Sequence, residues 1–276
     1  MSHPQLSQIW LFPIKSLDGV MVDRAAISVG GALQGDRQFA LHDAQGKYIN
    51  GKKYPAIHQI RAQYHLNANQ TPQAVTLTSP QNPSPQTFDL QTDRIDLSQW
   101  FSDYFGQPVT IRENTVNGFP DDPIAYGPTI ISEATLQTIT QWYGNLDVTI
   151  DVMQMRRRFR TNLEISHTVA FAEDALYGLA DTTKIFMIGA VTCAGTNPCQ
   201  RCPVPTRDPD TGVVFSRFQP HLTQQRQATL PPWAERSRFN HFYRVAVNTR
   251  ISPTEAGKIL AIGDQVTGLP LIQTDL

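Results

Sequence analysis

The sequence has 276 residues and a mass of 30.9 kDa, a length that fits two domains or one large β domain. Hydrophobic residues make up 40% of the chain, which excludes wholesale disorder. Lys and Arg number 23 against 24 Asp and Glu, so no basic field indicates nucleic acid or a polybasic membrane anchor. No apolar run could span a membrane, and the first residues do not form a secretory signal. We therefore expect a cytoplasmic protein.

The first third of the chain predicts mainly short strands. Strand-like runs occur at 9–14, 20–22, 25–29, 39–43 and 47–49. The Pro-rich stretch 66–92 contains the run 75–78 and predicts an exposed hairpin. Residues 96–105 place their apolar side chains at helical spacing, so this segment predicts a helix that ends at Gly106.

The polar segment 117–123 is the best candidate for a domain boundary, which predicts one domain over 1–117 and another over 118–276. After it, Ser132 can cap a helix that ends near Gly144. Strand-like segments follow at 159–165, 184–190, 243–248 and 259–262. Because strands outnumber helices and no βαβ rhythm appears, the predicted fold class is mainly β with flanking helices (α+β), in barrel-like or sandwich-like domains.

All three cysteines, Cys193, Cys199 and Cys202, lie within ten residues of one another. Such crowding is typical of a metal or redox site rather than a disulfide framework. A thiolate is a soft ligand suited to molybdenum, zinc or an iron–sulfur centre, and the adjacent Arg201 would favour the thiolate form. One Cys-x-x-Cys cannot complete a tetrahedral zinc site, so a cofactor would have to supply the other ligands. The alternative is a pair of buried thiols that only pack.

Four arginines surround Phe159, at positions 156, 157, 158 and 160. If this segment is a strand with Phe159 inward, Arg158 and Arg160 share the opposite face, where two guanidiniums suit a phosphate. A solvated basic edge is the alternative. Lys15 and Arg37 are further cations at the ends of predicted strands.

Eight short segments, in their order and spacing, resemble one known family. They are Phe-Pro-Ile-Lys-Ser at 12–16, Gly-Asp-Arg-Gln-Phe-Ala-Leu at 35–41, Ser-Glu-Ala-Thr-Leu at 132–136, Phe-Arg-Thr-Asn at 159–162, Ala-Glu-Asp at 172–174, Arg-Cys at 201–202, Asp-Pro-Asp-Thr-Gly at 208–212 and Ile-Gly-Asp at 262–264. The family is MOSC, and the resemblance is to the branch that includes mitochondrial amidoxime-reducing components and bacterial reductases of N-hydroxylated compounds. It implies an N-terminal MOSC β-barrel-like domain followed by a MOSC β-barrel domain.

The resemblance also implies a cofactor, molybdenum with molybdopterin. In that branch the cysteine that matches Cys202 ligates molybdenum beside the dithiolene sulfurs, which makes it the catalytic and metal-binding residue. Gln200 and Arg201 match cofactor contacts, although Gln200 stands where the family usually has Ser. Asp208 is a candidate proton donor, with a turn role before Pro209 as the alternative.

Five further residues match positions that bind the cofactor in the family. Lys15, Ser16 and Arg37 match residues at the pterin phosphate. Arg160 and Asn162 match the Arg and Asn of the family's Phe-Arg-Pro-Asn, in which Thr161 replaces Pro.

The function that the resemblance implies is the reduction of small N-hydroxylated substrates, such as amidoximes and hydroxylamino-purines. No iron–sulfur domain follows the last predicted strand, so we expect electrons from a separate ferredoxin-, flavin- or cytochrome-type protein. Pyridoxal phosphate binding is a further association of the family. Two alternatives stay open: a carrier of the cofactor or its sulfur without turnover, and a zinc or iron–sulfur knuckle of Cys199 and Cys202 at a dimer interface.

Overall fold

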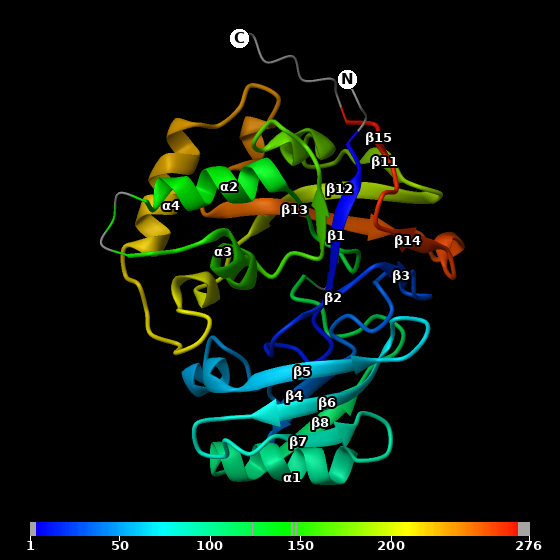
Figure 1. Cartoon of the computed structure of the whole chain (residues 1–276). Helices are drawn as coiled ribbons and strands as arrows, with labels where there is room; N and C mark the ends of the chain where they lie inside the picture. Colours follow the sequence, from blue (N-terminus) through cyan, green and yellow to red (C-terminus); the bar gives the residue numbers. More distant parts are fainter. Residues whose placement is uncertain (1–3, 123, 145, 147, 270–276) are drawn as a thin grey trace.

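The protein, as a computed structural model, forms two lobes that Figure 1 shows one above the other. The structure describes residues 4–122, 124–144, 146 and 148–269, so Pro123 of the predicted boundary lies outside the described residues. The fold class is the predicted one, mainly β with flanking helices. None of the helices in the described ranges is long and apolar enough to cross a membrane.

The upper lobe is built on a mixed eight-stranded sheet. Its strands, in spatial order, are β15 (Val266–Thr267), β11 (Lys184–Ile188), β12 (Val191–Gln200), β13 (Arg244–Ile251), β9 (Ile130–Ser132), β10 (Leu163–Ile165), β1 (Leu6–Leu11) and β2 (Val20–Val22). The pairing of β9 with β10 is parallel, and the other pairs are antiparallel. A separate antiparallel pair joins β3 (Arg24–Ala26) to β14 (Ile259–Ala261).

These pairings cross the predicted domain boundary. Strands β1 and β3 precede it in the sequence, yet each is hydrogen-bonded to a strand that follows it. Leu6, Ile9 and Leu11 of β1 are buried in one core with Leu163 of β10 and Val247 of β13. The division at 117 and 118 therefore stays a prediction, while the upper core is shared between both ends of the chain.

The lower lobe has its own core. It contains the pair β4 (Phe39–Asp43) and β8 (Val109–Glu113), the three-stranded sheet β5 (Arg61–Leu66), β6 (Pro72–Thr78) and β7 (Gln86–Asp89), and the helix α1 (Arg94–Phe105). The predicted helix over 96–105 is confirmed, and Gly106 caps it with a φ of 63°. The stretch 66–92 does form a hairpin, but Val75 and Leu77 are fully buried in the lower core. Its alternate side chains face inward, as the two-residue period of a strand requires.

Three helices flank the upper sheet, namely α2 (Glu133–Trp142), α3 (Val152–Phe159) and α4 (Phe218–Ala228), as Figure 1 shows. Ser132 caps α2 as predicted, because its side chain accepts a hydrogen bond from the Thr135 amide. Tyr143 ends α2, one residue before the expected Gly144.

The predicted strand over 159–165 is wrong in its first half. Asp151 caps α3 by accepting a hydrogen bond from the Gln154 amide, and the helix continues to Phe159. Met155 and Phe159, one turn apart, bury the same face of this helix. Arg160 then ends the helix in a left-handed conformation, and β10 begins only at Leu163. Arg158 and Arg160 therefore do not share the face of a strand.

Candidate functional site

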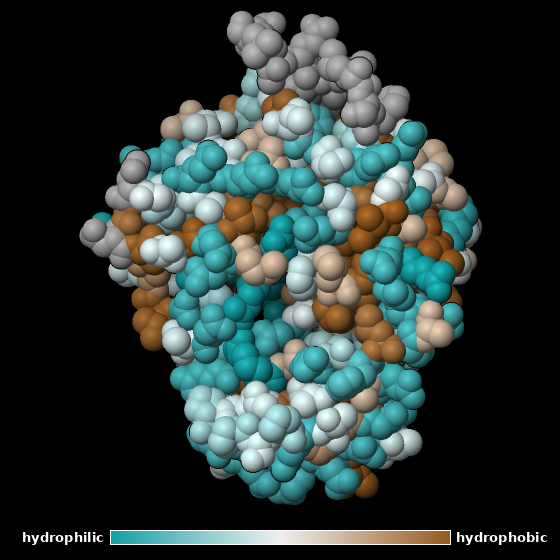
Figure 2. Space-filling view, viewed as in Figure 1, coloured by the Kyte–Doolittle hydropathy of each residue, from teal (hydrophilic) through white to brown (hydrophobic). Residues whose placement is uncertain are grey.

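A cavity of about 780 Å³ lies between the lobes, and every site residue predicted from the sequence lines it. The eight are Lys15, Ser16, Arg37, Arg160, Asn162, Gln200, Arg201 and Cys202. Its volume falls in the range of cofactor and ligand sites, about 300–1,000 Å³. Figure 2 shows the corresponding hollow between the lobes with hydrophilic residues around it. The structure thus brings together residues from both ends of the chain, although their roles stay predictions.

The three cysteines lie in three different environments. Cys193 is buried inside β12, and burial raises the pKa of its thiol to about 12. Cys199 and Cys202 are both half-buried and both line the cavity. Burial also raises the pKa of Cys199, although Arg201 acts in the opposite direction. Cys193 is therefore a packed core residue, whereas Cys199 and Cys202, the pair to which the packing alternative applies, both line the cavity.

Arg201 is held rigidly beside Cys202. Its Nε donates to the carbonyl of Val245 at 3.0 Å, and its Nη1 donates to the carbonyl of Phe159 at 2.8 Å. The guanidinium also lies over the Phe159 ring, 5.2 Å from its centre. Its Nη2 atom is buried and has no hydrogen-bond partner in the part of the chain that the structure describes. Because an unmade bond at a buried donor is costly, this atom is available to an anionic ligand.

Arg160 has the same property. Its Nη1 donates to the carbonyl of Leu17, and its guanidinium lies 4.2 Å from the centre of the Phe12 ring. Its buried Nη2 has no hydrogen-bond partner within the described ranges. Burial, followed by the neighbouring Arg37, lowers the pKa of Arg160 to about 10. The guanidinium remains charged near neutral pH, and an anion bound here would offset the cost of burying that charge.

Lys15 and Arg37 are two further cations that line the cavity, and together with Arg160 they form what we call the cationic wall. The Lys15 Nζ contacts Asp121 Oδ1 at 2.5 Å and donates to the Phe119 carbonyl at 2.8 Å. Burial lowers the pKa of Lys15 in spite of the Asp121 carboxylate. Arg37 pairs with Asp36 at 2.5 Å.

Asn162 connects this wall to the sheet. Its Oδ1 accepts from Arg37 Nη1 at 3.3 Å and from the Thr129 amide at 3.2 Å. Its Nδ2 donates to the carbonyl of Trp10 on β1 at 3.0 Å. The side chain is almost fully buried, so it orients Arg37 from a fixed position.

Three of the predicted site residues adopt a left-handed backbone that side chains rarely take. The φ angles are 74° at Ser16, 46° at Arg37 and 52° at Arg160. Such conformations cost on the order of 1–3 kcal/mol each and persist where the surrounding structure imposes them. Their concentration at one cavity indicates that the fold maintains strained backbone in order to direct these side chains.

The residues present fit an anionic cofactor that brings its own metal ligands. Among the described residues that line the cavity, Arg158, Arg160 and Arg201 each have a buried guanidinium nitrogen without a hydrogen-bond partner, and Cys202 lines the same cavity. Among the described residues, no group of three or more His, Cys, Asp or Glu side chains could hold a metal ion by itself. A metal bound at Cys202 would therefore need further ligands from the cofactor, as molybdenum receives from a dithiolene.

Comparison with known proteins places the chain in a family. The family model described as the MOSC domain matches residues 129–267, half of the chain. The chain belongs to the MOSC-domain family. A second model, described as the MOSC N-terminal beta barrel domain, matches residues 3–108 of this MOSC protein.

The curated relatives of this MOSC protein include mitochondrial and molybdenum-related proteins. It is 24% identical to the mitochondrial amidoxime reducing component 2 of Macaca fascicularis, with 76% of the chain and 68% of the relative covered. It is 26% identical to the mitochondrial amidoxime-reducing component 1 of Homo sapiens, with coverages of 78% and 69%. It is 26% identical to the molybdenum cofactor sulfurase of Danio rerio, over 61% of the chain and 25% of that protein. None of these three is named for pyridoxal phosphate, which stays a prediction.

Sequence reasoning missed the carboxylate that this MOSC protein places beside Lys15. Asp121 belongs to the segment that was interpreted as a boundary, and it meets Lys15 across 106 residues of sequence. No local pattern reports a contact at that separation. Asp208, by contrast, has its Oδ1 occupied by the Asp210 and Thr211 amides and the Thr211 hydroxyl. Partial burial opposes the effect, yet these bonds lower the pKa of Asp208, so the geometry gives it the turn role.

Proposed function

We propose that this MOSC protein is a molybdenum-cofactor-dependent reductase of N-hydroxylated compounds such as amidoximes and hydroxylamino-purines. The observation that supports it most strongly is that Cys202, Lys15, Arg37 and Arg160 line one and the same cavity. A soft thiol at one point and clustered cations elsewhere match the two ends of a molybdopterin, whose metal end is thiophilic and whose phosphate end is anionic. Similarity to two amidoxime-reducing components supports the same chemistry.

Each residue has a separate task in this proposal. Cys202 would hold the metal end of the cofactor. Lys15, Arg37 and Arg160 would neutralise its phosphate, while Arg201 would stabilise negative charge near the thiolate through its unpartnered Nη2. Asn162 would keep Arg37 oriented toward the cavity. The protein thereby binds, orients and electrostatically tunes the reacting centre.

When bound, the cofactor would supply a metal that delivers two electrons to the N–O bond of the substrate. In the overall reaction that bond breaks, and two electrons and two protons convert N–OH into N–H and one molecule of water. We propose that the electrons arrive from a separate ferredoxin-, flavin- or cytochrome-type protein.

The test is expression in a host that makes the molybdenum cofactor, followed by metal analysis and an assay with benzamidoxime and a chemical reductant. We expect about one molybdenum per chain, and a loss of both metal and activity in Cys202→Ala with the fold retained. Cys199→Ala is the matched control, because it removes a cavity-lining thiol only three residues away. Equal losses in both variants, or zinc or iron in place of molybdenum, would contradict the proposal.

One observation keeps a second function in view. The chain also resembles part of a protein named molybdenum cofactor sulfurase, which favours a carrier of the cofactor or of its sulfur. Rapid transfer of bound cofactor to an apo-enzyme, without reductase turnover with any of several electron donors, would support the carrier instead.

A further inference from the structure

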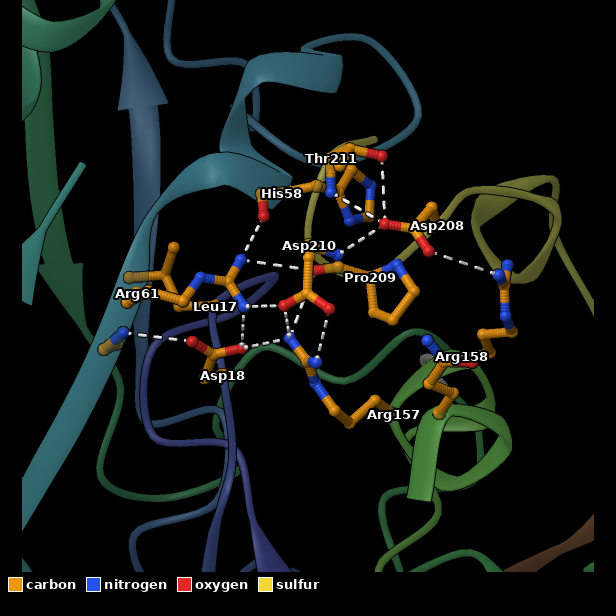
Figure 3. Close-up of polar contacts among 12 residues, drawn as sticks. Leu17, Asp18, His58, Arg61, Arg157, Arg158, Asp208, Pro209, Asp210 and Thr211 are labelled. Carbon is orange, nitrogen blue, oxygen red and sulfur yellow. Dashed lines mark hydrogen bonds and ion pairs between the residues drawn. The ribbon is translucent and has the colours of Figure 1, made fainter. Parts of the chain in front are cut away.

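A cluster of alternating charges closes one side of the cavity, and Figure 3 shows it together with the loop that follows Cys202. We define this Asp210 cluster as Asp18, Arg61, Arg157 and Asp210. Asp210 Oδ1 accepts from Arg61 Nη1 at 3.0 Å and from Arg157 Nη2 at 2.8 Å, and Oδ2 accepts from Arg157 Nη1 at 3.0 Å. One carboxylate thus joins two guanidiniums that come from different lobes.

Asp18 forms the opposite side of the cluster. Its Oδ1 lies 3.2 Å from Arg61 Nη1 and 3.5 Å from Arg157 Nη2, and its Oδ2 accepts from the Ala62 amide at 3.1 Å. Two cations and two anions therefore alternate with no net charge. Each carboxylate contacts both guanidiniums, so the removal of either one would leave two cations that share a single anion.

The cluster lies where three site-bearing segments meet. Asp18 follows Lys15 and Ser16 in the sequence, Arg157 precedes Arg160 by three residues, and Asp210 lies eight residues after Cys202. Arg61, at the start of β5, adds the lower lobe. A group that fixes these segments to one another also fixes the walls of the cavity.

The loop that carries Asp210 is tight within itself but is tied to the rest of the protein by arginines. Its ends pair at the bridge between Arg207 and Val214. The Pro209 carbonyl accepts from Arg61 Nη2 and from Arg157 Nη2, both at 3.2 Å. Arg158 Nη1 holds the start of the loop by donating to the Pro205 and Arg207 carbonyls. Arginine side chains therefore provide most of the contacts that hold this loop in place, with one further bond from Gln59 Nε2 to the Thr211 carbonyl at 3.4 Å.

We propose that Asp210 is a positioning residue that acts through Arg61 and Arg157 to hold the Cys202 segment against the lower lobe, so that the Cys202 thiol faces the cavity. The proposal rests on the proposed function only in treating Cys202 as the residue that binds the cofactor. Half of the Asp210 side chain is exposed, so salt reaches the cluster and weakens it.

The experiment measures alkylation of each cysteine by iodoacetamide in the cofactor-free protein, with mass spectrometry to separate the three sites. In Asp210→Asn we expect Cys202 to react about fivefold faster than in the wild type. This factor corresponds to the energy that a networked ion pair at the surface contributes. Raising NaCl from about 0.05 to about 1 M should accelerate Cys202 in the wild type and leave the variant unchanged, because the cluster is already open there.

Two controls keep the result specific. Buried Cys193 reports general loosening, and it should react slowly throughout. Glu113→Gln removes the partner of Arg94, a comparable pair within the lower lobe, and should leave the Cys202 rate unchanged. Asp210→Glu keeps the carboxylate and should bring the Cys202 rate back toward the wild-type value, a rescue that a general loss of structure would not give.

Wild-type reactivity of Cys202 in Asp210→Asn, or acceleration of Cys193 by the same factor, would overturn the proposal. The measurement uses no cofactor and no substrate, so its outcome does not depend on whether the protein is a reductase. Failure of the reductase assay with a positive alkylation result would refute only the proposed function.

Discussion

Arg156 and Arg160 lie one helical turn apart, and the difference between them separates structural charge from charge that is available to a ligand. Arg156 is buried and donates through Nε and Nη2 to both carboxylate oxygens of Glu164, which is fully buried. Arg160 forms no ion pair among the described residues, and its buried Nη2 has no partner. A bidentate pair stabilises its own two charges, whereas an unpaired buried cation indicates a place for an anion.

The largest effect on stability should come from breaking the ion pair between Arg156 and Glu164. Glu164→Ala leaves Arg156 buried and uncompensated, so we expect a loss of about 3–5 kcal/mol in the free energy of unfolding. Urea denaturation of the cofactor-free protein measures it. A loss below about 1 kcal/mol would mean that the pair is as weak as an exposed one.

Removing Arg160 should have the opposite effect, with little change in stability and a large loss of bound metal. Arg160→Met takes away no ion pair, so the free energy of unfolding should change by less than about 1 kcal/mol, while molybdenum content should fall about tenfold or more. Arg217→Met at the N-cap of α4, a cation that is not among the residues lining the cavity, is the control and should keep its metal content. Unfolding of Arg160→Met, rather than loss of metal, would assign Arg160 to structure alone.

A buried acid without a cation extends the comparison. Glu173 is fully buried, and one of its oxygens has no hydrogen-bond partner among the residues that the structure describes. Burial, followed by the neighbouring Asp174, raises its pKa to about 7. Its folded pKa exceeds the ordinary value, so its stability contribution is complete below about pH 4.5 and is lost as pH rises through about 7. Glu173→Gln should therefore remove this pH dependence and stabilise the protein by about 1–3 kcal/mol at pH 8. Thermal unfolding of the wild type and of Glu173→Gln at pH 5 and pH 8 tests this expectation. The same change in stability between the two pH values in both proteins would contradict it.

The smallest effect concerns the carboxylate that Lys15 already contacts. Asp121 is 75% exposed on its side chain and competes with any incoming anion for the Lys15 ammonium. Asp121→Asn should tighten binding of pyrophosphate to the cofactor-free protein about threefold to fivefold, in line with the modest energy of an exposed pair. Asp122→Asn, which affects a bond to Asn248 instead, is the matched control in calorimetry. Weaker binding in Asp121→Asn would show that Asp121 helps to order the site.

The sequence alone was sufficient for the features that have a local cause. The helix over 96–105 follows from apolar spacing and a glycine cap, and Ser132 caps α2 through a bond to an amide three residues away. The residue set around Cys202 follows from short segments that match a family, and all eight residues line one cavity. The arginine run misled the strand prediction because charged residues hide the spacing of Met155 and Phe159, and the helix depends on burying that pair.

Only the tertiary structure decided which charges have partners. Arg61 and Asp210 meet across 149 residues, and Lys15 and Asp121 across 106. Whether a guanidinium at 156 or at 160 finds a carboxylate depends on which strand packs beside α3. The sequence determined which residue types are available and the elements that have local signals, such as the helix over 96–105 and the Ser132 cap, because those depend on neighbours along the chain. The fold determined their electrostatic partners, because charge interactions depend on distance in space and on exclusion of water.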